Sequence, residues 1–362
     1  LGTLKAGANL TVSGLISVAG NSAVSIPAAG TTLTYSGGDL NVGSHTLSIG
    51  GAGTFSNATG SPLVLDVADS ILSLTGNGTI SGPMKLESGT LKSTGSPTVS
   101  GAMTQYSDAT IEVSTNQTLT YSGAPFSLGA NTLTLTGGGT LVSGGLDLNN
   151  ANSKLLLNSI TVDSVSTTVD NSLGVDVDND STITSLSVAN ITPVSIASGK
   201  TLSGAITVTA GSLKLTEAGT LASSVSMSGG VLDADESSTV SGALSHTADI
   251  TIDVADNKTL TYSGSAISLG AYTLTLTGGG NLASGGLTLN NADSKLLLNS
   301  ITVDSVSTTI DNSLGVDVDN DSTITSLSVA NITPVAITSG RSLSGGITVS
   351  AGSLKLNETG TL

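Results

Sequence analysis

Aliphatic and hydroxyl-bearing residues alternate along most of the chain in short runs that end at glycine, alanine or asparagine. The runs TLSG, AITVTAG and SLKLTEAG, which follow one another from Thr201, show this alternation with period two. Such alternation predicts short β-strands with one buried and one exposed face, and the small residues predict turns between them. We expect Leu202, Ile206 and Val208 to point inward, and the serine and threonine residues to point outward.

A threonine followed by an aliphatic residue marks a regular period. Thr201, Thr220, Thr239 and Thr259 follow one another at nearly equal intervals, and each interval divides into three short strands. This pattern is typical of a parallel β-helix, in which every coil pairs with the next about 4.8 Å away. The predicted fold is an all-β parallel β-helix (β-solenoid) with about 20 residues per coil and three strands per coil. Parallel connections favour right-handed winding.

A longer repeat divides the chain further. Segment 133–221 aligns without gaps to segment 274–362 and matches it at 76 of 89 positions, and the likeness reaches back to Val99. Tandem duplication accounts for this identity. We expect one continuous solenoid over 1–362, with divergent coils at 1–98, a first repeat unit at 99–239 and a second, incomplete unit at 240–362. An antiparallel β-sandwich array is the alternative fold, and it predicts domain-sized repeats with hairpin turns.

The composition suits a narrow aliphatic interior. The chain has 46 Gly but no Trp, two Phe and five Tyr, so stacked Leu, Ile and Val are expected to fill the core without aromatic residues. The absence of Cys excludes disulfides and thiolate chemistry. A net charge of −16 argues against nucleic acid or an anionic membrane as a partner. No apolar run reaches the roughly 18 residues that a transmembrane helix needs.

The coils GTLVSGGLDLNNANSKLLLNSITV and AGSLKLTEAGTLASSVSMSGGVLDAD resemble the Gly-, Ser- and Thr-rich repeats of bacterial surface adhesins and autotransporter passenger domains. The resemblance covers nearly the whole chain. It implies a right-handed β-helix that is displayed at the cell surface or in a secreted matrix, with a role in adhesion, biofilm matrix or fibre formation. It also implies glycans or host-cell surfaces as partners. The chain departs from these families in showing no receptor-binding insertion.

Contacts with other copies of the chain are a further expectation. Open solenoid ends carry unpaired strand edges that can stack on another copy. In the KLLLNS strands, Leu156 and Leu297 are expected to face outward, where they serve either a lateral contact or no contact at all. End-to-end and lateral self-association are therefore both predicted.

The motif LGVDVDNDS, present twice, is the strongest candidate for chemistry. Its carboxylates are Asp176, Asp178 and Asp180 in one copy and Asp317, Asp319 and Asp321 in the other. Alternation places the first two of each copy on one outer face, roughly 6 to 7 Å apart. The spacing matches the opening of a calcium loop, although Ser181 stands where that loop has Gly and no Glu closes it. A structural calcium site and a solvated acidic face both stay open, and calcium is the sole cofactor considered.

A carbohydrate-active enzyme is one functional rival, because pectin-degrading enzymes and phage tailspikes also use carboxylates on a β-helix. The Asp-rich coil from Ile160 to Ser181 has neither a basic residue nor an aromatic platform for a sugar chain. His45 and His246 lie in different copies of the array and are expected to be ordinary surface residues. We therefore predict no catalytic residue and no enzyme activity.

An ice-binding solenoid is the other rival. The segment TLTLT at 132–136 and 273–277 presents threonine in register, but equivalent strands elsewhere read SLKLT or ITIDV. The function predicted from sequence is a non-enzymatic extracellular structural repeat protein that forms the rod of a surface fibre, filament or adhesin stalk.

Overall fold

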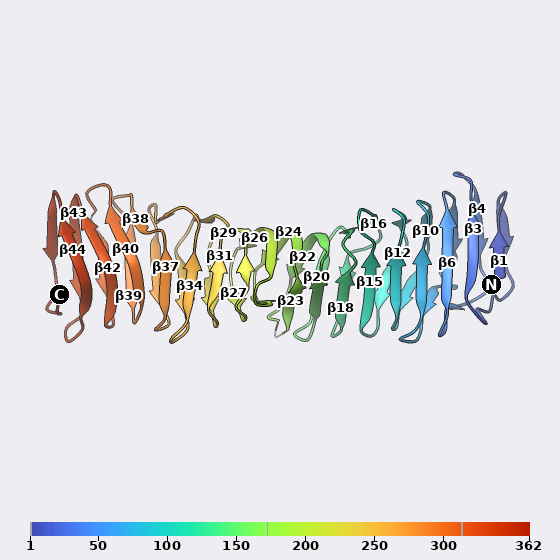
Figure 1. Ribbon diagram of the computed structural model, residues 1–362, viewed down its shortest axis with the longest axis horizontal. Helices are drawn as coiled ribbons and strands as arrows, with labels where there is room; N and C mark the ends of the chain where they lie inside the picture. The colour runs from blue at the N-terminus through green and yellow to red at the C-terminus, as the bar shows by residue number, and fades with distance from the viewer. Residues whose placement is uncertain (1, 172, 313) are drawn as a thin grey trace. The chain divides into compact units, whose positions relative to one another are not determined.

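The structure is a computed structural model that describes residues 2–171, 173–312 and 314–362. Its regular elements over these residues are all β-strands, and the strands pair in parallel (Figure 1). They form a β-solenoid of about 17 turns with about 21 residues per turn. The predicted fold class is confirmed, and the antiparallel sandwich is excluded.

The chain divides into two compact units, Leu1–Ser185 and Leu186–Leu362. This boundary falls inside the predicted sequence repeat 99–239. The 141-residue repeat is nevertheless visible when strands of the two compact units are compared. For example, β18 (Thr132–Thr136) in the first unit corresponds in the repeat alignment to β36 (Thr273–Thr277) in the second, and both read TLTLT. The predicted repeat boundaries at 98/99 and 239/240 are defined by the sequence and stay a prediction.

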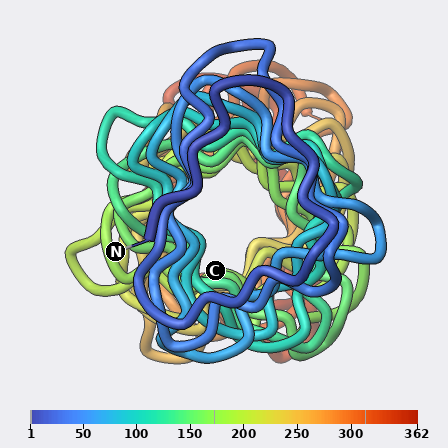
Figure 2. Tube along the Cα trace, turned by 90° about the vertical axis from the view of Figure 1, so that its right-hand side faces the viewer, coloured from blue at the N-terminus to red at the C-terminus, as the bar shows by residue number. Residues whose placement is uncertain are grey.

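In the N-terminal unit, the first strand of each coil belongs to one long sheet, here called sheet A. Figure 2 shows the coils of this unit, from blue to green, following one another around a common interior. The sheet A strands of this unit are β1 (Gly2–Lys5), β3 (Ser22–Ile26), β6 (Thr46–Gly51), β9 (Ile71–Leu74), β12 (Thr90–Ser93), β15 (Ala109–Val113), β18, β21 (Lys154–Asn158) and β23 (Gly174–Asn179).

The remaining strands of this unit form two further faces. Sheet B contains β2 (Leu10–Val12), β4 (Thr32–Tyr35), β7 (Thr54–Asn57), β10 (Thr79–Ser81), β13 (Thr98–Val99), β16 (Thr118–Tyr121), β17 (Phe126–Ser127), β19 (Thr140–Val142), β20 (Leu146–Leu148), β22 (Thr161–Thr167) and β24 (Ser181–Val188), of which β24 runs across the unit boundary. Sheet C contains β5 (Leu40–Asn41), β8 (Leu63–Leu65), β11 (Met84–Leu86) and β14 (Met103–Gln105).

The C-terminal unit repeats this construction. Its sheet A strands are β25 (Ile191–Ile196), β27 (Ser212–Leu215), β30 (Val231–Ala234), β33 (Ile250–Val254), β36, β39 (Lys295–Asn299), β41 (Gly315–Val318), β43 (Ile332–Ile337) and β45 (Ser353–Leu356). Its sheet B strands are β26 (Thr201–Val208), β28 (Thr220–Leu221), β29 (Ser224–Met227), β31 (Ser238–Val240), β32 (Leu244–His246), β34 (Thr259–Tyr262), β35 (Ile267–Ser268), β37 (Asn281–Ser284), β38 (Leu287–Leu289), β40 (Thr302–Thr308), β42 (Ser322–Val329) and β44 (Leu343–Val349).

Some coils have two strands where three were expected. Between β19 and β20 the chain turns at Gly144 and Gly145, whose φ angles are +66° and +123°. In the next coil Asp163 and Ser164 occupy the neighbouring positions, and β22 continues through them without a break. In this coil the second and third strands form one continuous strand.

Aliphatic ladders fill the interior as predicted. Leu202, Ile206 and Val208 are all buried in the C-terminal unit. The expectation of a core without aromatic residues is wrong, since Tyr35, Phe55, Tyr121 and Phe126 are also fully buried. Tyr121 is accommodated because its hydroxyl donates to the Ala124 carbonyl at 2.6 Å and accepts from the Met103 amide at 3.1 Å, which satisfies its polar atom.

Candidate functional site

The first carboxylate of each LGVDVDNDS motif is paired with a lysine of the preceding coil. Lys154 on β21 lies 2.5 Å from Asp176 on β23, and Lys295 on β39 lies 2.6 Å from Asp317 on β41. Asp176 stands beside Leu156 in the strand register, and both are half-buried while their neighbours on either side are buried, so both point outward as predicted. A cation from the chain itself thus already faces these two carboxylates.

The other carboxylates of the motif lie at exposed positions near the end of the strand. Asp178, Asp180, Asp319 and Asp321 are all solvent-exposed. Asp321 accepts hydrogen bonds from the Ser342 amide at 2.7 Å and the Ser342 hydroxyl at 3.0 Å. Among the described residues, no three His, Cys, Asp or Glu side chains lie in an arrangement that could hold a metal ion. The calcium site stays a prediction from the sequence.

Asp163 shows the role that many acidic and amide residues have at the corners. Its carboxylate accepts hydrogen bonds from the Ser143 amide at 3.0 Å, the Ser143 hydroxyl at 2.7 Å and the Gly144 amide at 2.9 Å. Burial alone would raise the pKa of Asp163, but these bonds and one from the Ser164 amide lower it overall. The corresponding Asp304 caps the Ser284 amide at 3.0 Å.

This cap recurs around both units. In each case a side-chain oxygen of Asp or Asn accepts a hydrogen bond from a backbone N–H in an adjacent coil. That N–H lies at a corner, where it has no partner in the strand ladder. The pairs, acceptor first, are Asn9 and Thr32, Asn21 and Thr46, Asp66 and Gly43, Asn77 and Ser96, Asp108 and Thr132, Asn149 and Gly129, Asp249 and Thr273, and Asn290 and Gly270. Much of the polar composition therefore serves coil-to-coil contacts.

A second group of carboxylates, not singled out from the sequence, lies on sheet A of the C-terminal unit. Lys214 on β27 lies 3.2 Å from Asp233 and 2.9 Å from Asp235, and Asp253 on β33 stands next to Asp233 in register. Burial raises the pKa of Asp233, with Asp235 and Asp253 adding to the effect and Lys214 opposing it. The hydrogen bond to Asp235 raises the pKa of Lys214.

Comparison of the two repeats explains this group. In the N-terminal unit Lys92 and Glu112 form an ion pair at 2.8 Å, and the positions 141 residues further along the chain hold Asp233 and Asp253. Aspartate in place of lysine at the first of these positions puts two like charges side by side. The sequence did contain a signal for this contact, because Asp233 and Asp253 are both at outward positions and are separated by about one coil.

The two histidines occupy different environments. The ring nitrogens of His246 lie 3.1 Å from the Ala248 carbonyl and 3.1 Å from the Ser268 carbonyl, and the ring packs edge-on against Tyr272. His45 lines an open hollow of the surface beside Asn21. His246 is therefore half-buried and bonded to its surroundings, unlike the ordinary surface residue that was expected.

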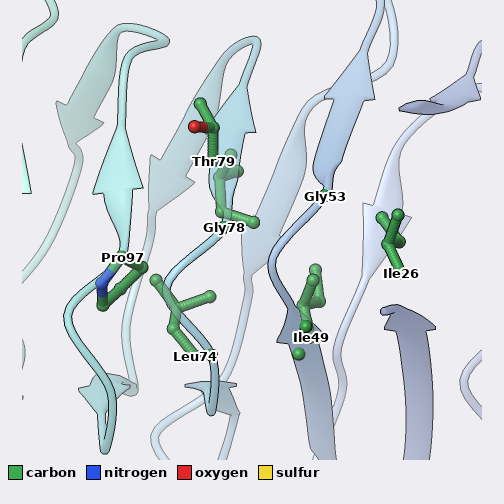
Figure 3. Close-up of a pocket in the computed structure, with 11 residues that line it drawn as sticks. Ile26, Ile49, Gly53, Leu74, Gly78, Thr79 and Pro97 are labelled. Carbon is green, nitrogen blue, oxygen red and sulfur yellow. The ribbon is translucent and has the colours of Figure 1, made fainter. Parts of the chain in front are cut away.

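Figure 3 shows a small cavity at a glycine-rich corner of the N-terminal unit, lined by Ile26, Ile49, Leu74 and Pro97 among others. Its volume is about 10 Å³. A cavity of this size holds one water molecule at most. It is a packing gap between closely spaced coils, and it offers no room for a ligand.

Comparison of the chain with protein-family models, curated proteins and solved structures finds no match. Within the described ranges there is no helix long and apolar enough to cross a membrane.

Proposed function

We propose that the chain is a non-enzymatic structural segment of an extracellular protein, in which it forms the rod of a surface fibre, filament or adhesin stalk. The observation that carries the proposal is the use of polar side chains between coils. Lys154 and Asp176 link β21 to β23, and Asp163 caps the coil before its own. Such contacts add to the backbone ladders and resist the separation of neighbouring coils, as a spacer under tension requires.

Labelling on the source cells tests this proposal. Antibodies raised against the purified chain should bind intact cells or their secreted matrix as strongly as permeabilised cells. Electron microscopy with gold-labelled antibody should place the label on fibres or filaments outside the envelope. Label that appears solely after permeabilisation would overturn the proposal.

A carbohydrate-active enzyme is the second candidate, and the stacked Asp233 and Asp253 favour it. Adjacent parallel strands lie about 4.8 Å apart, close to the carboxyl separation of about 5 Å in retaining glycosidases. The raised pKa of Asp233, caused mainly by burial, suits a general acid. The Lys214 ion pair with Asp233 opposes this role, because a paired carboxylate is a poor proton donor.

An assay for reducing ends separates the two candidates. The purified chain is incubated with a panel of neutral and acidic polysaccharides, with Asp233→Asn and Asp253→Asn variants in parallel. We expect no release of reducing ends by any of the three proteins. If the unmodified chain releases reducing ends and both variants fail to do so, the chain is a carbohydrate-active enzyme.

A further inference from the structure

Sheet B of the N-terminal unit carries a two-column grid of hydroxyl groups on its outer face. Five successive coils contribute the strands β4, β7, β10, β13 and β16, each with threonine, a buried residue, and then threonine or serine. The first column is Thr32, Thr54, Thr79, Thr98 and Thr120, which pair in unbroken register. The second is Thr34, Ser56 and Ser81, in register, followed by Ser100 and Ser122 at the same alternation.

The core holds this grid in place. The residues between the two columns are Leu33, Phe55, Ile80, Val99 and Tyr121, all of which are buried. Parallel pairing spaces neighbouring rows by about 4.8 Å, and two residues along a strand span about 6.6 Å. Threonine is β-branched, so few χ1 rotamers are available and its hydroxyl and methyl groups keep a regular orientation. The backbone therefore fixes the spacing of the grid in two dimensions, and β-branching restrains the side chains of the first column.

The threonine side chains of the first column are half-buried, and their hydroxyls are not used for hydrogen bonds within the described residues. In the described part of the chain, none of these five threonine hydroxyls has a hydrogen-bond partner, and in the second column Ser100 turns to the Ile80 carbonyl at 3.5 Å. None of the five strands contains a charged residue, although the chain carries a net charge of −16. The aromatic residues of these strands, Tyr35, Phe55 and Tyr121, point inward.

These features select the class of ligand. A face without charge has no means of attracting a polyanion or a basic protein segment. A face without exposed aromatic rings lacks the stacking platform that a sugar chain would use. What the face offers is a repeating set of hydroxyls, each able to donate and accept hydrogen bonds, together with the threonine methyl groups of the first column. A solid whose surface repeats in two dimensions matches it better than a single soluble molecule.

We propose that this hydroxyl grid binds the surface of an ice crystal. Each row adds a weak contact, and many rows on one rigid body bind together far more tightly than any one row alone. The TLTLT strand β18, which the sequence brings to attention, lies on sheet A, whereas the grid lies on the neighbouring sheet B. This function goes beyond a structural role and does not depend on it.

The C-terminal unit carries a shorter version of the grid. Thr201, Thr220, Thr239 and Thr261 pair in register on its sheet B. Ala222 interrupts the second column next to Thr220. This face has fewer rows and an incomplete second column, so its contribution to binding is smaller than that of the N-terminal unit.

Ice-affinity partitioning of the purified full chain tests the inference. A solution is frozen slowly, and protein in the ice is compared with protein left in the liquid. The unmodified chain should be enriched in the ice. Thr79→Tyr combined with Thr98→Tyr places two bulky rings in the middle of the grid and should lower the enrichment about tenfold, as the loss of one to two hydrogen bonds would. Thr79→Val keeps the shape, removes one hydroxyl and should have a smaller effect.

The matched control is Thr134→Tyr, at an outward position of β18 on sheet A. It should leave the enrichment unchanged, and circular dichroism should show the same melting transition for all variants. Exclusion of the unmodified chain from ice would overturn the inference, as would equal loss in the control. Retention on insoluble chitin or cellulose together with exclusion from ice would identify a crystalline polysaccharide as the ligand instead. None of these results bears on the surface-labelling test of the structural role.

Discussion

Single side chains link the corners of the coils by reaching to a neighbouring coil, which is the preceding coil for Asp163 and the following coil for Asp321 and Lys154. Asp163 and Asp321 do so with carboxylates that accept backbone N–H groups, and Lys154 does so through an ion pair with Asp176. A solenoid corner leaves some N–H groups without a ladder partner, and a buried unpaired N–H costs free energy. Residues that look like candidate chemistry in the sequence thus gain a structural explanation.

Asp163→Ala tests this role and its pH dependence. The pKa of Asp163 is lowered in the folded chain, so its stabilisation is fully present above the unfolded pKa of about 3.9 and is lost as the pH falls through the lower folded value. Near neutral pH we expect a loss of about 1 to 2 kcal/mol in the free energy of unfolding, reduced from the value of a buried charged hydrogen bond because the group is partly exposed.

Urea unfolding of the unmodified chain and of the variant, near neutral pH and below about pH 3, measures the effect. The difference between the two proteins should shrink at the acidic pH. The control is Asp304→Ala, which removes a similar cap in the C-terminal unit. A difference that stays the same at both pH values would show that the charge of Asp163 is not involved.

Calcium provides a second test at the scale of residues. Lys154 and Lys295 already pair with Asp176 and Asp317, so we expect the same melting temperature in excess calcium and in excess chelator. Scanning calorimetry measures it. A rise with calcium that disappears in the Asp176→Asn, Asp317→Asn double variant would instead establish the metal site predicted from the sequence.

At one corner of the N-terminal unit, glycine decides how closely neighbouring coils approach. A Cβ added to Gly51, which ends β6, would lie 2.1 Å from the Ile26 carbonyl of the preceding coil. A Cβ on Gly76 would lie 2.2 Å from the Gly51 carbonyl in turn. Glycine therefore stacks on glycine at this corner, beside the cavity in Figure 3, because any larger residue would push the coils apart.

Comparison of Gly51→Ala with Gly38→Ala separates the free-energy cost of the close contact between coils from the cost of backbone strain. The φ angles are almost equal, at +107° for Gly51 and +105° for Gly38, but nothing lies within 4 Å of a Cβ at Gly38. Gly38→Ala should cost about 1 to 2 kcal/mol of stability from the left-handed backbone alone. Gly51→Ala should cost about 1 to 3 kcal/mol more, because the coils must also move apart. Denaturant unfolding gives both values, and equal costs would contradict the stacking explanation.

At the scale of the whole molecule, negative charge dominates. The chain has 26 acidic and 10 basic residues, and repulsion between like charges destabilises the compact state. Salt screens this repulsion over a distance of about 10 Å at 0.1 M. It also weakens the lysine ion pairs, but acidic residues outnumber the lysines that pair with them.

We therefore expect the thermal midpoint to rise as sodium chloride is added to a low-salt buffer. Calorimetry over a salt series measures it. Potassium chloride serves as the control, since screening by a monovalent salt does not depend on which cation is used. A midpoint that falls with salt would mean that the ion pairs, rather than the net charge, control stability.

Local patterns along the chain were enough to predict the fold class, the coil period and the inward residues of the solenoid. These are local properties, because alternation with period two identifies a half-buried strand and a short regular period identifies a coil. Leu202, Ile206 and Val208 could be placed inside from their own neighbours, and the structure buries all three.

Which residues meet across coils depends on the register between coils, which only the three-dimensional structure shows. The intervals between successive threonines of the first grid column are unequal, so an average period misplaces partners by several positions. A shift of one residue moves a side chain to the opposite face of a strand. For this reason the ion pair of Lys154 with Asp176, the stacking of Asp233 on Asp253 and the hydroxyl grid of sheet B emerge from the observed register of the coils.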